Sequence, residues 1–276
     1  MSNYHNTSKS TSLWIVFFAY LSAIVLAAVC IYFLPDNYSL LQKSLFADVL
    51  ATIMIFAFSV YFSNSSFYDP YWSLIPIILV SYWFVISGKT LADLRSVLVL
   101  ILVSWWGLRL TWNWILRWQG IKDEDFRYID LKNKSKSLWW FTDFMGIHLF
   151  PTLIVFGALI PLITIFEQQE TPLNLIDGIA VLITVLAIIL ETKADNQLRK
   201  FKESRTDKNQ RLTSGLWKFV KYPNYLGEVL FWWGLFFFAL AVNVNNWHTI
   251  YGPVIMSLLF IFVSVPLMKK RLSMKI

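Results

Sequence analysis

The chain has 276 residues, of which 57% are hydrophobic and 15% are charged, and it contains 14 Trp, 12 Tyr and 23 Phe. This composition excludes an ordinary soluble domain and is typical of an integral membrane protein rich in interfacial aromatic residues. The formal net charge is +7, but nucleic acid is a poor candidate partner because no soluble domain is present to bind it. Cys30 is the only cysteine, which excludes a disulfide framework and a thiolate metal cluster.

Apolar runs long enough, or nearly long enough, to cross a bilayer recur along the chain. They predict an all-α, polytopic membrane protein with about eight transmembrane helices. Residues 1–12 are rich in Ser, Thr and Asn and are predicted to be disordered, residues 13–62 form the N-terminal transmembrane helices, and residues 63–276 form a larger membrane domain. The runs are Leu13–Leu34, Leu45–Phe62, Tyr71–Ser87, Ser96–Leu116, Phe144–Phe166, Leu173–Leu190, Leu226–Val242 and Trp247–Met268.

The distribution of positive charge predicts the orientation. If both termini and the loops that follow every second run are placed on one side, that side holds 20 of the 24 Lys and Arg residues. Lys43, Lys89 and Arg95 lie in the opposite loops, and Arg109 lies within a helix. Because cytoplasmic loops carry the excess of Lys and Arg, both termini are expected to be cytoplasmic. The basic surface also favours contact with anionic lipid headgroups.

Two long cytoplasmic loops, at residues 117–143 and 191–225, are the places where chemistry could occur. In the first, the run Glu124-Asp125-Phe126-Arg127-Tyr128 is either a solvated loop or a lid. In the second, Glu191, Asp195, Arg199 and Lys202 are spaced four, four and three residues apart. This spacing predicts that the sixth transmembrane helix continues into the cytoplasm with one polar face, as an ordinary surface helix also would.

The next transmembrane helix is predicted to begin at Pro223, whose missing N–H is not needed in a first helical turn. Asn224 and Glu228 then lie four residues apart on one face, and Glu228 lies within the membrane. The glutamate makes either an interhelical hydrogen bond or part of a binding site. A helix N-terminus beside basic residues is suited to a phosphate or carboxylate group. Since the sequence contains no GxGxxG or P-loop motif, a dinucleotide would not bind on a Rossmann domain.

These residues resemble a known family. Ala194-Asp195, Gly215-Leu216, Tyr222-Pro223-Asn224-Tyr225 and Gly227-Glu228 resemble the C-terminal domain of the steroid 5-alpha reductase superfamily. Asp69-Pro70-Tyr71-Trp72, Leu108-Arg109-Leu110 and Arg117-Trp118 agree with it too, so the resemblance covers roughly Asp69 to Met268. The Pro-Asn-Tyr-x-Gly element also occurs, in variants, in isoprenylcysteine carboxyl methyltransferases.

The resemblance implies an NADPH-dependent reductase of an activated carbon–carbon double bond in a steroid-like or other lipid, with the hydrophobic substrate entering from the bilayer. It implies that the equivalents of Asp195, Asn224 and Glu228 contact NADPH and that basic residues between Arg199 and Arg211 hold its phosphates. A guanidinium within a helix needs a carboxylate or a phosphate, so Arg109 is expected to meet Glu228, Asp195 or the cofactor. The expected cofactor-binding set is Asp195, Arg199, Lys202, Arg211, Tyr222, Asn224, Tyr225, Glu228 and Arg109.

The chain also departs from this family. The Gln-Glu pair and the Tyr that bind the enone oxygen in the steroid reductases are not found in the sequence, and Trp106 occupies the expected Tyr position. The substrate is therefore left open. A second interpretation is an S-adenosylmethionine-dependent membrane methyltransferase, and a third is a transporter or scaffold with a structural polar core.

The proton donor must come from other residues. Asp69, with Tyr68 and Tyr71 beside it, is the expected catalytic group, because a carboxylic acid or a phenol can protonate the product of hydride transfer. Asp69 could instead cap the helix that begins after Pro70. His148 is interpreted as a packing or interfacial residue, and no metal ligand set is expected.

Overall fold

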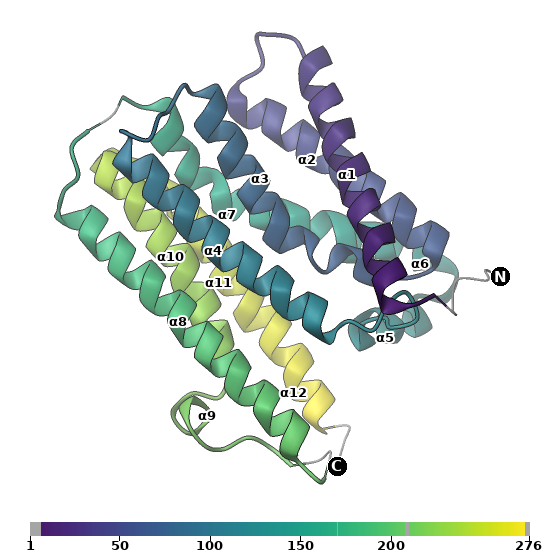
Figure 1. Ribbon diagram of the computed structural model, residues 1–276. Coiled ribbons are helices and arrows are strands. Elements are labelled where there is room, and N and C mark those ends of the chain that lie inside the picture. Colours follow the sequence, from purple (N-terminus) through teal and green to yellow (C-terminus); the bar gives the residue numbers. More distant parts are fainter. Residues whose placement is uncertain (1–6, 170, 208–209, 274–276) are drawn as a thin grey trace. The chain divides into compact units, whose positions relative to one another are not determined.

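The computed structural model describes residues 7–169, 171–207 and 210–273, and these are folded almost entirely into helices (Figure 1). No strand occurs among the described residues. The predicted all-α class is therefore confirmed. Large apolar side chains such as Trp14, Phe17 and Phe18 on the first helix are exposed, as expected where a helix faces lipid rather than water.

Within the described part of the chain, eight helical segments are long and apolar enough to cross a membrane, which confirms the predicted number. The chain is a multi-pass integral membrane protein. The segments each overlap one of the eight apolar runs found in the sequence, with at least one end that differs from that of the run. They are Lys9–Phe33, Leu40–Phe62, Ser65–Ile86, Leu94–Arg117, Phe126–Glu167, Leu175–Ser204, Pro223–Val242 and Val244–Lys270.

Several of these segments consist of more than one helical element. The longer α-helices are α1 (Lys9–Phe33), α2 (Leu40–Phe62), α3 (Tyr71–Ile86), α4 (Leu94–Arg117), α5 (Phe126–Ser135), α7 (Phe150–Glu167), α8 (Leu175–Ser204), α10 (Pro223–Val242), α11 (Tyr251–Leu259) and α12 (Val265–Ser273). The shorter elements are η2 (Ser65–Tyr68), η3 (Lys136–Leu138), α6 (Trp139–Thr142), η4 (Asp143–Leu149), α9 (Leu216–Phe219), η5 (Val244–Ile250) and η6 (Phe260–Ser264).

The N-terminal segment corrects one prediction. Helix α1 begins at Lys9, and the Ser8 hydroxyl caps it by accepting a hydrogen bond from the Thr11 amide. Ser12 is fully buried. Residues 9–12, which were predicted to be disordered, are thus helical because Ser8 supplies a cap that satisfies the first turn. Residues 1–6 of the same prediction lie outside the described residues.

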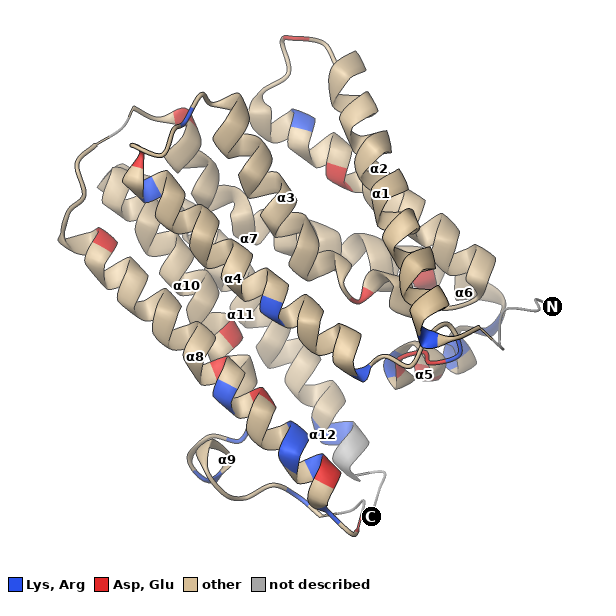
Figure 2. Cartoon of the chain, viewed as in Figure 1, with Lys and Arg blue, Asp and Glu red and all other residues tan. Residues whose placement is uncertain are grey.

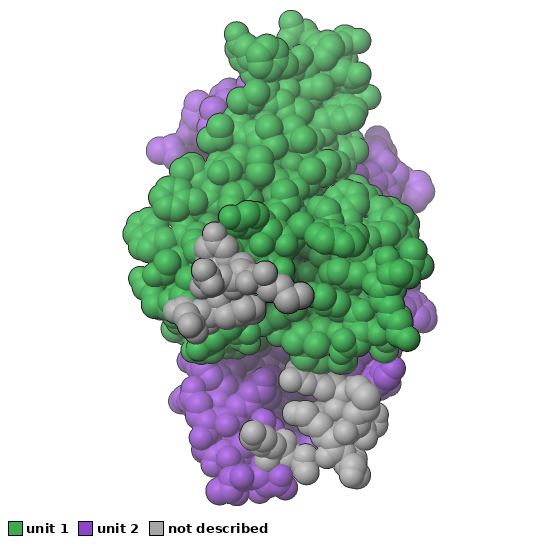
Figure 3. Space-filling view, turned by 90° about the vertical axis from the view of Figure 1, so that its right-hand side faces the viewer, with its two compact units in different colours: residues 1–83, 103–156 green, residues 84–102, 157–276 purple. Residues whose placement is uncertain are grey.

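The chain divides into two compact units (Figure 3). Unit 1 comprises residues 1–83 and 103–156, and unit 2 comprises residues 84–102 and 157–276. The boundaries fall inside α3, α4 and α7, and not at residue 63, where the sequence had suggested a division. Candidate sites are therefore described within each unit.

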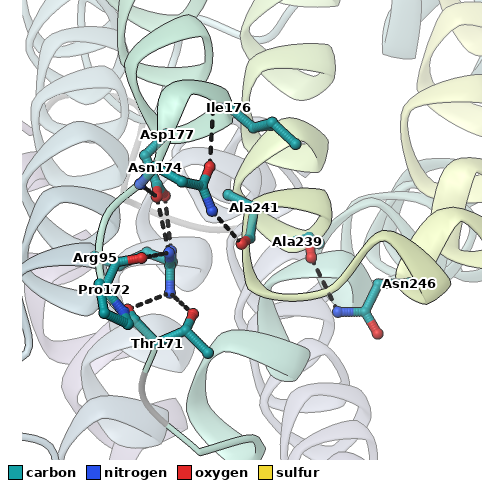
Figure 4. Close-up of polar contacts among 9 residues, drawn as sticks. All are labelled: Arg95, Thr171, Pro172, Asn174, Ile176, Asp177, Ala239, Ala241 and Asn246. Carbon is teal, nitrogen blue, oxygen red and sulfur yellow. Dashed lines mark hydrogen bonds and ion pairs between the residues drawn. The ribbon is translucent and has the colours of Figure 1, made fainter.

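Unit 2 is held at one end by a buried ion pair between α4 and α8 (Figure 4). Arg95, which the sequence had placed in a loop, lies in the first turn of α4, and it donates to both carboxylate oxygens of Asp177 at 2.7 and 2.8 Å. Its remaining N–H groups donate to the Thr171 hydroxyl and carbonyl and to the Pro172 carbonyl. A cavity of about 380 Å³ borders Arg95, but all five guanidinium donors are already used, so the residue has a structural role.

We predict that Arg95→Met lowers the stability of the folded protein by about 3–5 kcal/mol, because Asp177 is left as an uncompensated buried charge. Thermal unfolding in detergent measures this effect. The double variant Arg95→Met/Asp177→Asn should recover part of the loss. Lys43→Met is the control, since its partner Asp36 is exposed and 3.7 Å away, and it should leave stability nearly unchanged. Equal losses of stability in Arg95→Met and Lys43→Met would contradict the structural role of Arg95.

Candidate functional site

The polar face predicted beyond the sixth apolar run is part of one continuous helix. Helix α8 extends to Ser204, well past the end of the apolar run at Leu190, which confirms the predicted extension. Figure 2 shows charged residues along this end of α8 and on α12. Along the face, Glu191 is buried, Asp195 and Arg199 are half-buried and Lys202 is exposed. The exposure thus rises steadily toward the end of the helix.

The beginning of α10 lies against this part of α8. Pro223 occupies the first turn of α10, as predicted. The side-chain nitrogen of Asn224 donates a hydrogen bond to the Asp195 carboxylate at 3.4 Å. This bond brings together two of the predicted cofactor-binding residues. Tyr222 and Tyr225 stack, with ring centroids 5.5 Å apart. Residues from α8 and α10 therefore form one cluster, here called the α8–α10 cluster: Asp195, Tyr222, Asn224 and Tyr225.

Two polar atoms of this cluster are buried without a hydrogen-bond partner among the described residues. They are the hydroxyl of Tyr222 and the side-chain oxygen of Asn224. Burial raises the pKa of the Tyr222 phenol, and the positive charge of Arg211 opposes that rise. A buried polar atom without a partner costs about 1–3 kcal/mol. The cluster is therefore better satisfied with a ligand that supplies hydrogen-bonding groups than without one.

The remaining cations of the predicted set surround the cluster less tightly. Arg199 donates to the Asn196 side chain at 2.9 Å, and Arg211 is exposed on the segment before α9. The turn before α9 is fixed to α8, because Gln197 accepts a hydrogen bond from the Leu216 amide and Ala194 accepts one from the Trp217 indole. Exposed Lys and Arg side chains at this position can reach an anionic ligand.

Glu228 lies deeper than the α8–α10 cluster. It is buried, and its carboxylate accepts a hydrogen bond from the Trp232 indole at 2.9 Å, one turn further along α10. One interpretation of the sequence had suggested a hydrogen bond between helices. The bond with Trp232 lies within α10 instead. A contact with a cofactor stays a prediction for this residue.

Gly227 has a packing role. A Cβ atom at this position would lie 2.7 Å from the Glu191 Cβ and 2.9 Å from the Ala187 carbonyl oxygen of α8. Gly234, two turns later, meets Thr184 of α8 in the same way. Small residues at such positions let two helix backbones approach closely. The two glycines therefore fix the distance between α8 and α10 on which the cluster depends.

Arg109 belongs to the other compact unit. It lies on α4 within unit 1, with its Nε and Nη2 atoms buried, whereas Asp195 and Glu228 belong to unit 2. The expected pairing of Arg109 with either carboxylate stays a prediction.

In unit 1, Asp69 has a partner that the sequence did not single out first. Its carboxylate accepts a hydrogen bond of 2.7 Å from the Tyr128 hydroxyl, and both residues are half-buried. Asp69 follows η2 and precedes α3, and Tyr128 lies in the first turns of α5. The run Glu124 to Tyr128 is thus attached to unit 1, and the Ser65 amide also donates to Glu124 at 2.8 Å. Burial raises the pKa of Glu124, and the Ser65 hydrogen bond and the charge of Lys132 oppose that rise.

Tyr68 and Tyr71, which were expected beside Asp69, bond elsewhere. The Tyr68 hydroxyl lies 2.8 Å from the Thr152 hydroxyl, and the Tyr71 hydroxyl donates to the Asp48 carboxylate at 2.8 Å. Both tyrosines are fully buried. The helical turn that connects η2 to α3 points them into the core of unit 1, because Tyr68 and Tyr71 lie three residues apart on one face and Asp69 lies on another.

Sequence reasoning missed Asp48. It is buried in α2 and forms a second carboxyl–phenol pair with Tyr71. The available signal was its position as the only acidic residue in the second apolar run, because ionisable residues within a membrane are usually functional or paired. No group of three or more potential metal ligands occurs among the described residues.

Comparison with known proteins gives the family. Residues 55–276 match the family model described as "Protein of unknown function (DUF1295)". The chain belongs to the DUF1295 family. A protein of Schizosaccharomyces pombe described as uncharacterized is 23% identical over 218 residues, which cover 70% of this chain. The chain spans 63% of the length of that relative. No solved structure matches the chain significantly.

We predict that Gly227→Ala destabilises unit 2 by about 1–3 kcal/mol, since the added methyl group overlaps α8 and must push the helices apart. Thermal unfolding in detergent measures the loss. Gly178→Ala is the matched control, because Gly178 lies on α8 with nothing within 4 Å of an added Cβ. A variant Gly227→Ala as stable as Gly178→Ala would contradict the proposed close approach of α8 and α10.

Proposed function

We propose that the protein is a membrane-embedded, NADPH-dependent reductase that acts on an activated carbon–carbon double bond of a lipid. The observation that supports this most directly is the α8–α10 cluster. There the Tyr222 hydroxyl and the side-chain oxygen of Asn224 are buried without hydrogen-bond partners among the described residues. Basic residues flank the cluster, as an anionic dinucleotide requires. The motif resemblance adds the identity of the cofactor.

Each residue of the cluster has a definite task in this proposal. Asn224 and Tyr222 supply hydrogen bonds to the nicotinamide or ribose end of the cofactor, and Asp195 holds Asn224 in place through the bond at 3.4 Å. Arg199, Lys202 and Arg211 bind phosphate groups, which the positive end of the α10 helix dipole also favours. When bound, NADPH supplies the hydride.

The protonation half of the reaction belongs to a carboxyl–phenol pair in unit 1. The described residues of unit 1 contain two such pairs, Asp69–Tyr128 and Asp48–Tyr71. In each pair the phenol donates to the carboxylate, so a proton can move along the hydrogen bond after the phenol has protonated a substrate atom. The half-buried Asp69–Tyr128 pair is the proposed donor because it is reachable from the cytoplasmic loops. A bilayer-derived hydrophobic molecule is the proposed substrate class.

The same cluster has a second possible cofactor, S-adenosylmethionine, since the Pro-Asn-Tyr-x-Gly element is shared with membrane methyltransferases. That cofactor carries no phosphate, so the cations Arg199, Lys202 and Arg211 favour NADPH. Equilibrium binding of both molecules to the purified protein in detergent decides between them. Binding of S-adenosylmethionine alone would replace the reductase proposal, and binding of neither would overturn both.

We predict that Asn224→Ala weakens NADPH binding by about tenfold or more, as the loss of a hydrogen bond to a buried group costs about 1–3 kcal/mol. Asn245→Ala is the control, because Asn245 is exposed beyond the other end of α10. Glu228→Gln keeps an oxygen for the Trp232 indole and removes only the charge, so it separates binding from stability. Unchanged affinity in Asn224→Ala would contradict the assignment of the cluster.

Ionic strength provides an independent control on the same binding assay. Affinity that depends on Arg199, Lys202 and Arg211 should fall as salt is raised. The fall should be smaller in Arg211→Gln. Salt-independent affinity would exclude phosphate binding by these side chains.

We predict that Asp69→Asn lowers turnover of an enone substrate by about 10²–10⁴-fold, the usual contribution of a general acid. NADPH affinity should not change, since unit 2 is intact. NADPH oxidation with a panel of 3-oxo-4-ene steroids and linear enones measures turnover. Tyr128→Phe should resemble Asp69→Asn. Full activity in both variants, with loss in Asp48→Asn, would transfer the role to the Asp48–Tyr71 pair.

A further inference from the structure

Unit 1 contains a serine, a histidine and an aspartate joined in series, and the reductase proposal uses none of them. The Ser59 hydroxyl of α2 lies 3.0 Å from His148 Nε2. His148 Nδ1 lies 3.1 Å from the Asp143 carbonyl oxygen and 3.3 Å from its carboxylate. All three residues are buried, with His148 fully enclosed. His148 is therefore a buried packing residue, as the sequence suggested, and also a member of a polar cluster.

The hydrogen bonds define the proton positions on the imidazole. Nδ1 faces two acceptor oxygens of Asp143, so the ring proton belongs on Nδ1 and Nε2 is the acceptor. Nε2 can then accept the proton of the Ser59 hydroxyl. The same hydroxyl also lies 3.0 Å from the Ile55 carbonyl oxygen, so its single proton can point to either acceptor. This is the arrangement of a nucleophile, a general base and an orienting carboxylate.

The local backbone keeps the imidazole in this position. Asp143 and His148 lie in η4, a π-helix from Asp143 to Leu149, in which residues five apart are stacked along the axis. The Ser65 hydroxyl donates to the Asp143 carboxylate at 2.9 Å. Phe56 and Tyr68 contact the His148 ring, with centroids 5.2 and 5.1 Å away. The Asp143 carboxylate and the His148 imidazole are thus held in place before any substrate binds.

A cavity of about 160 Å³ gives this cluster a place for a substrate. Ser59 and Asp143 form part of its wall, together with Lys132 and the indole rings of Trp139 and Trp140. Glu124 also lines this cavity. The Lys132 ammonium lies over the Trp139 ring at 5.4 Å, so the wall includes a cationic side chain. A cation there is suited to the oxyanion that forms when a hydroxyl attacks a carbonyl group.

We propose that Ser59, His148 and Asp143 form a second active site, which hydrolyses carboxylic esters of small acyl groups. The cavity, at about 160 Å³, is several times larger than the roughly 10–15 Å³ that a single water molecule needs. This space fits an ester group with an acyl chain of only a few carbon atoms. The proposal is independent of the reductase function.

The chemistry balances without any cofactor. Ser59 Oγ forms a bond to the acyl carbon while its proton passes to His148 Nε2, and the Asp143 carboxylate stabilises the imidazolium. The bond from the acyl carbon to the leaving alcohol oxygen breaks, and the proton on Nε2 moves to that oxygen. Water then attacks the acyl-serine, gives a proton to Nε2, and releases the carboxylic acid as the proton returns to Ser59.

The experiment is covalent labelling of the full-length protein in detergent with an alkyl fluorophosphonate, which reacts with activated serines and loses fluoride. Intact mass spectrometry should show one adduct, and peptide mapping should locate it on Ser59. Ser59→Ala should abolish it. Ser63→Ala is the matched control, because Ser63 lines the same cavity whereas the serine bonded to His148 Nε2 is Ser59, and it should label normally. No adduct on Ser59 in the folded wild-type protein would overturn the proposal.

Two further variants separate activation from simple accessibility. His148→Gln should slow labelling by roughly 10²–10⁴-fold, the usual contribution of a general base, and Asp143→Asn should slow it as well. Hydrolysis of p-nitrophenyl acetate should fall in parallel. Labelling of Ser59 at an unchanged rate in His148→Gln would show that the serine is merely accessible, and this would also overturn the proposal.

A cysteine variant keeps the test valid if Ser59→Ala fails to fold. Ser59→Cys in a Cys30→Ala background retains the size of the side chain and places a thiol next to His148. Iodoacetamide should alkylate it faster than in the same protein carrying His148→Gln, because the imidazole promotes thiolate formation. Equal rates in the two proteins would argue against a general base at His148.

Discussion

Polar side chains inside apolar helices must find partners within the protein, and this constraint explains most of the structure. Hydrocarbon offers no hydrogen bonds, so each buried charge or hydroxyl without a partner costs several kcal/mol. Arg95 meets this requirement with Asp177 and three further oxygens. Asp48 meets it with the Tyr71 hydroxyl, and Glu228 with the Trp232 indole. The helices of each unit are thus positioned by a few polar bonds as well as by apolar packing.

The same constraint distinguishes structural polar residues from candidate binding residues. Arg95 uses all its donors on the protein and has none left for a ligand, although a cavity borders it. Tyr222 and Asn224 are in the opposite situation, because each keeps a buried oxygen without a partner among the described residues. The packing of Gly227 against α8 places these atoms beside Asp195 at the end of the membrane-spanning part. Burial with incomplete hydrogen bonding is therefore the better guide to a site here than burial or charge alone.

The sequence predicted helices and helix starts, which depend on neighbouring residues. It missed side-chain contacts between residues far apart in the chain. The apolar runs predicted eight helices, and Pro223 predicted the start of α10, because hydrophobic length and a missing N–H act locally. The motif resemblance assigned Asn224 and Asp195 to one cofactor site, and the bond between their side chains was not predicted. The Ser59–His148 bond joins residues 89 positions apart, and no pattern along the chain encodes it. Tyr68 and Tyr71 were assigned to Asp69 by proximity in sequence, whereas a helical turn directs them to other partners.

The two carboxyl–phenol pairs of unit 1 differ in how a spent proton can be replaced. Asp48 and Tyr71 are buried, with only 4% and 1% of their surface exposed. The Thr52 hydroxyl donates to the Asp48 carbonyl oxygen and lies 2.9 Å from the Thr152 hydroxyl. A proton lost from that pair has no direct exchange with water. Asp69 and Tyr128 are half-buried next to the segment that leads into α5, outside the long apolar helices α2 and α3. A reductase consumes one proton in every turnover, so its acid must be recharged from solvent each time. On this physical ground the Asp69–Tyr128 pair is suited to repeated proton donation, and the Asp48–Tyr71 pair to fixing α2 against α3.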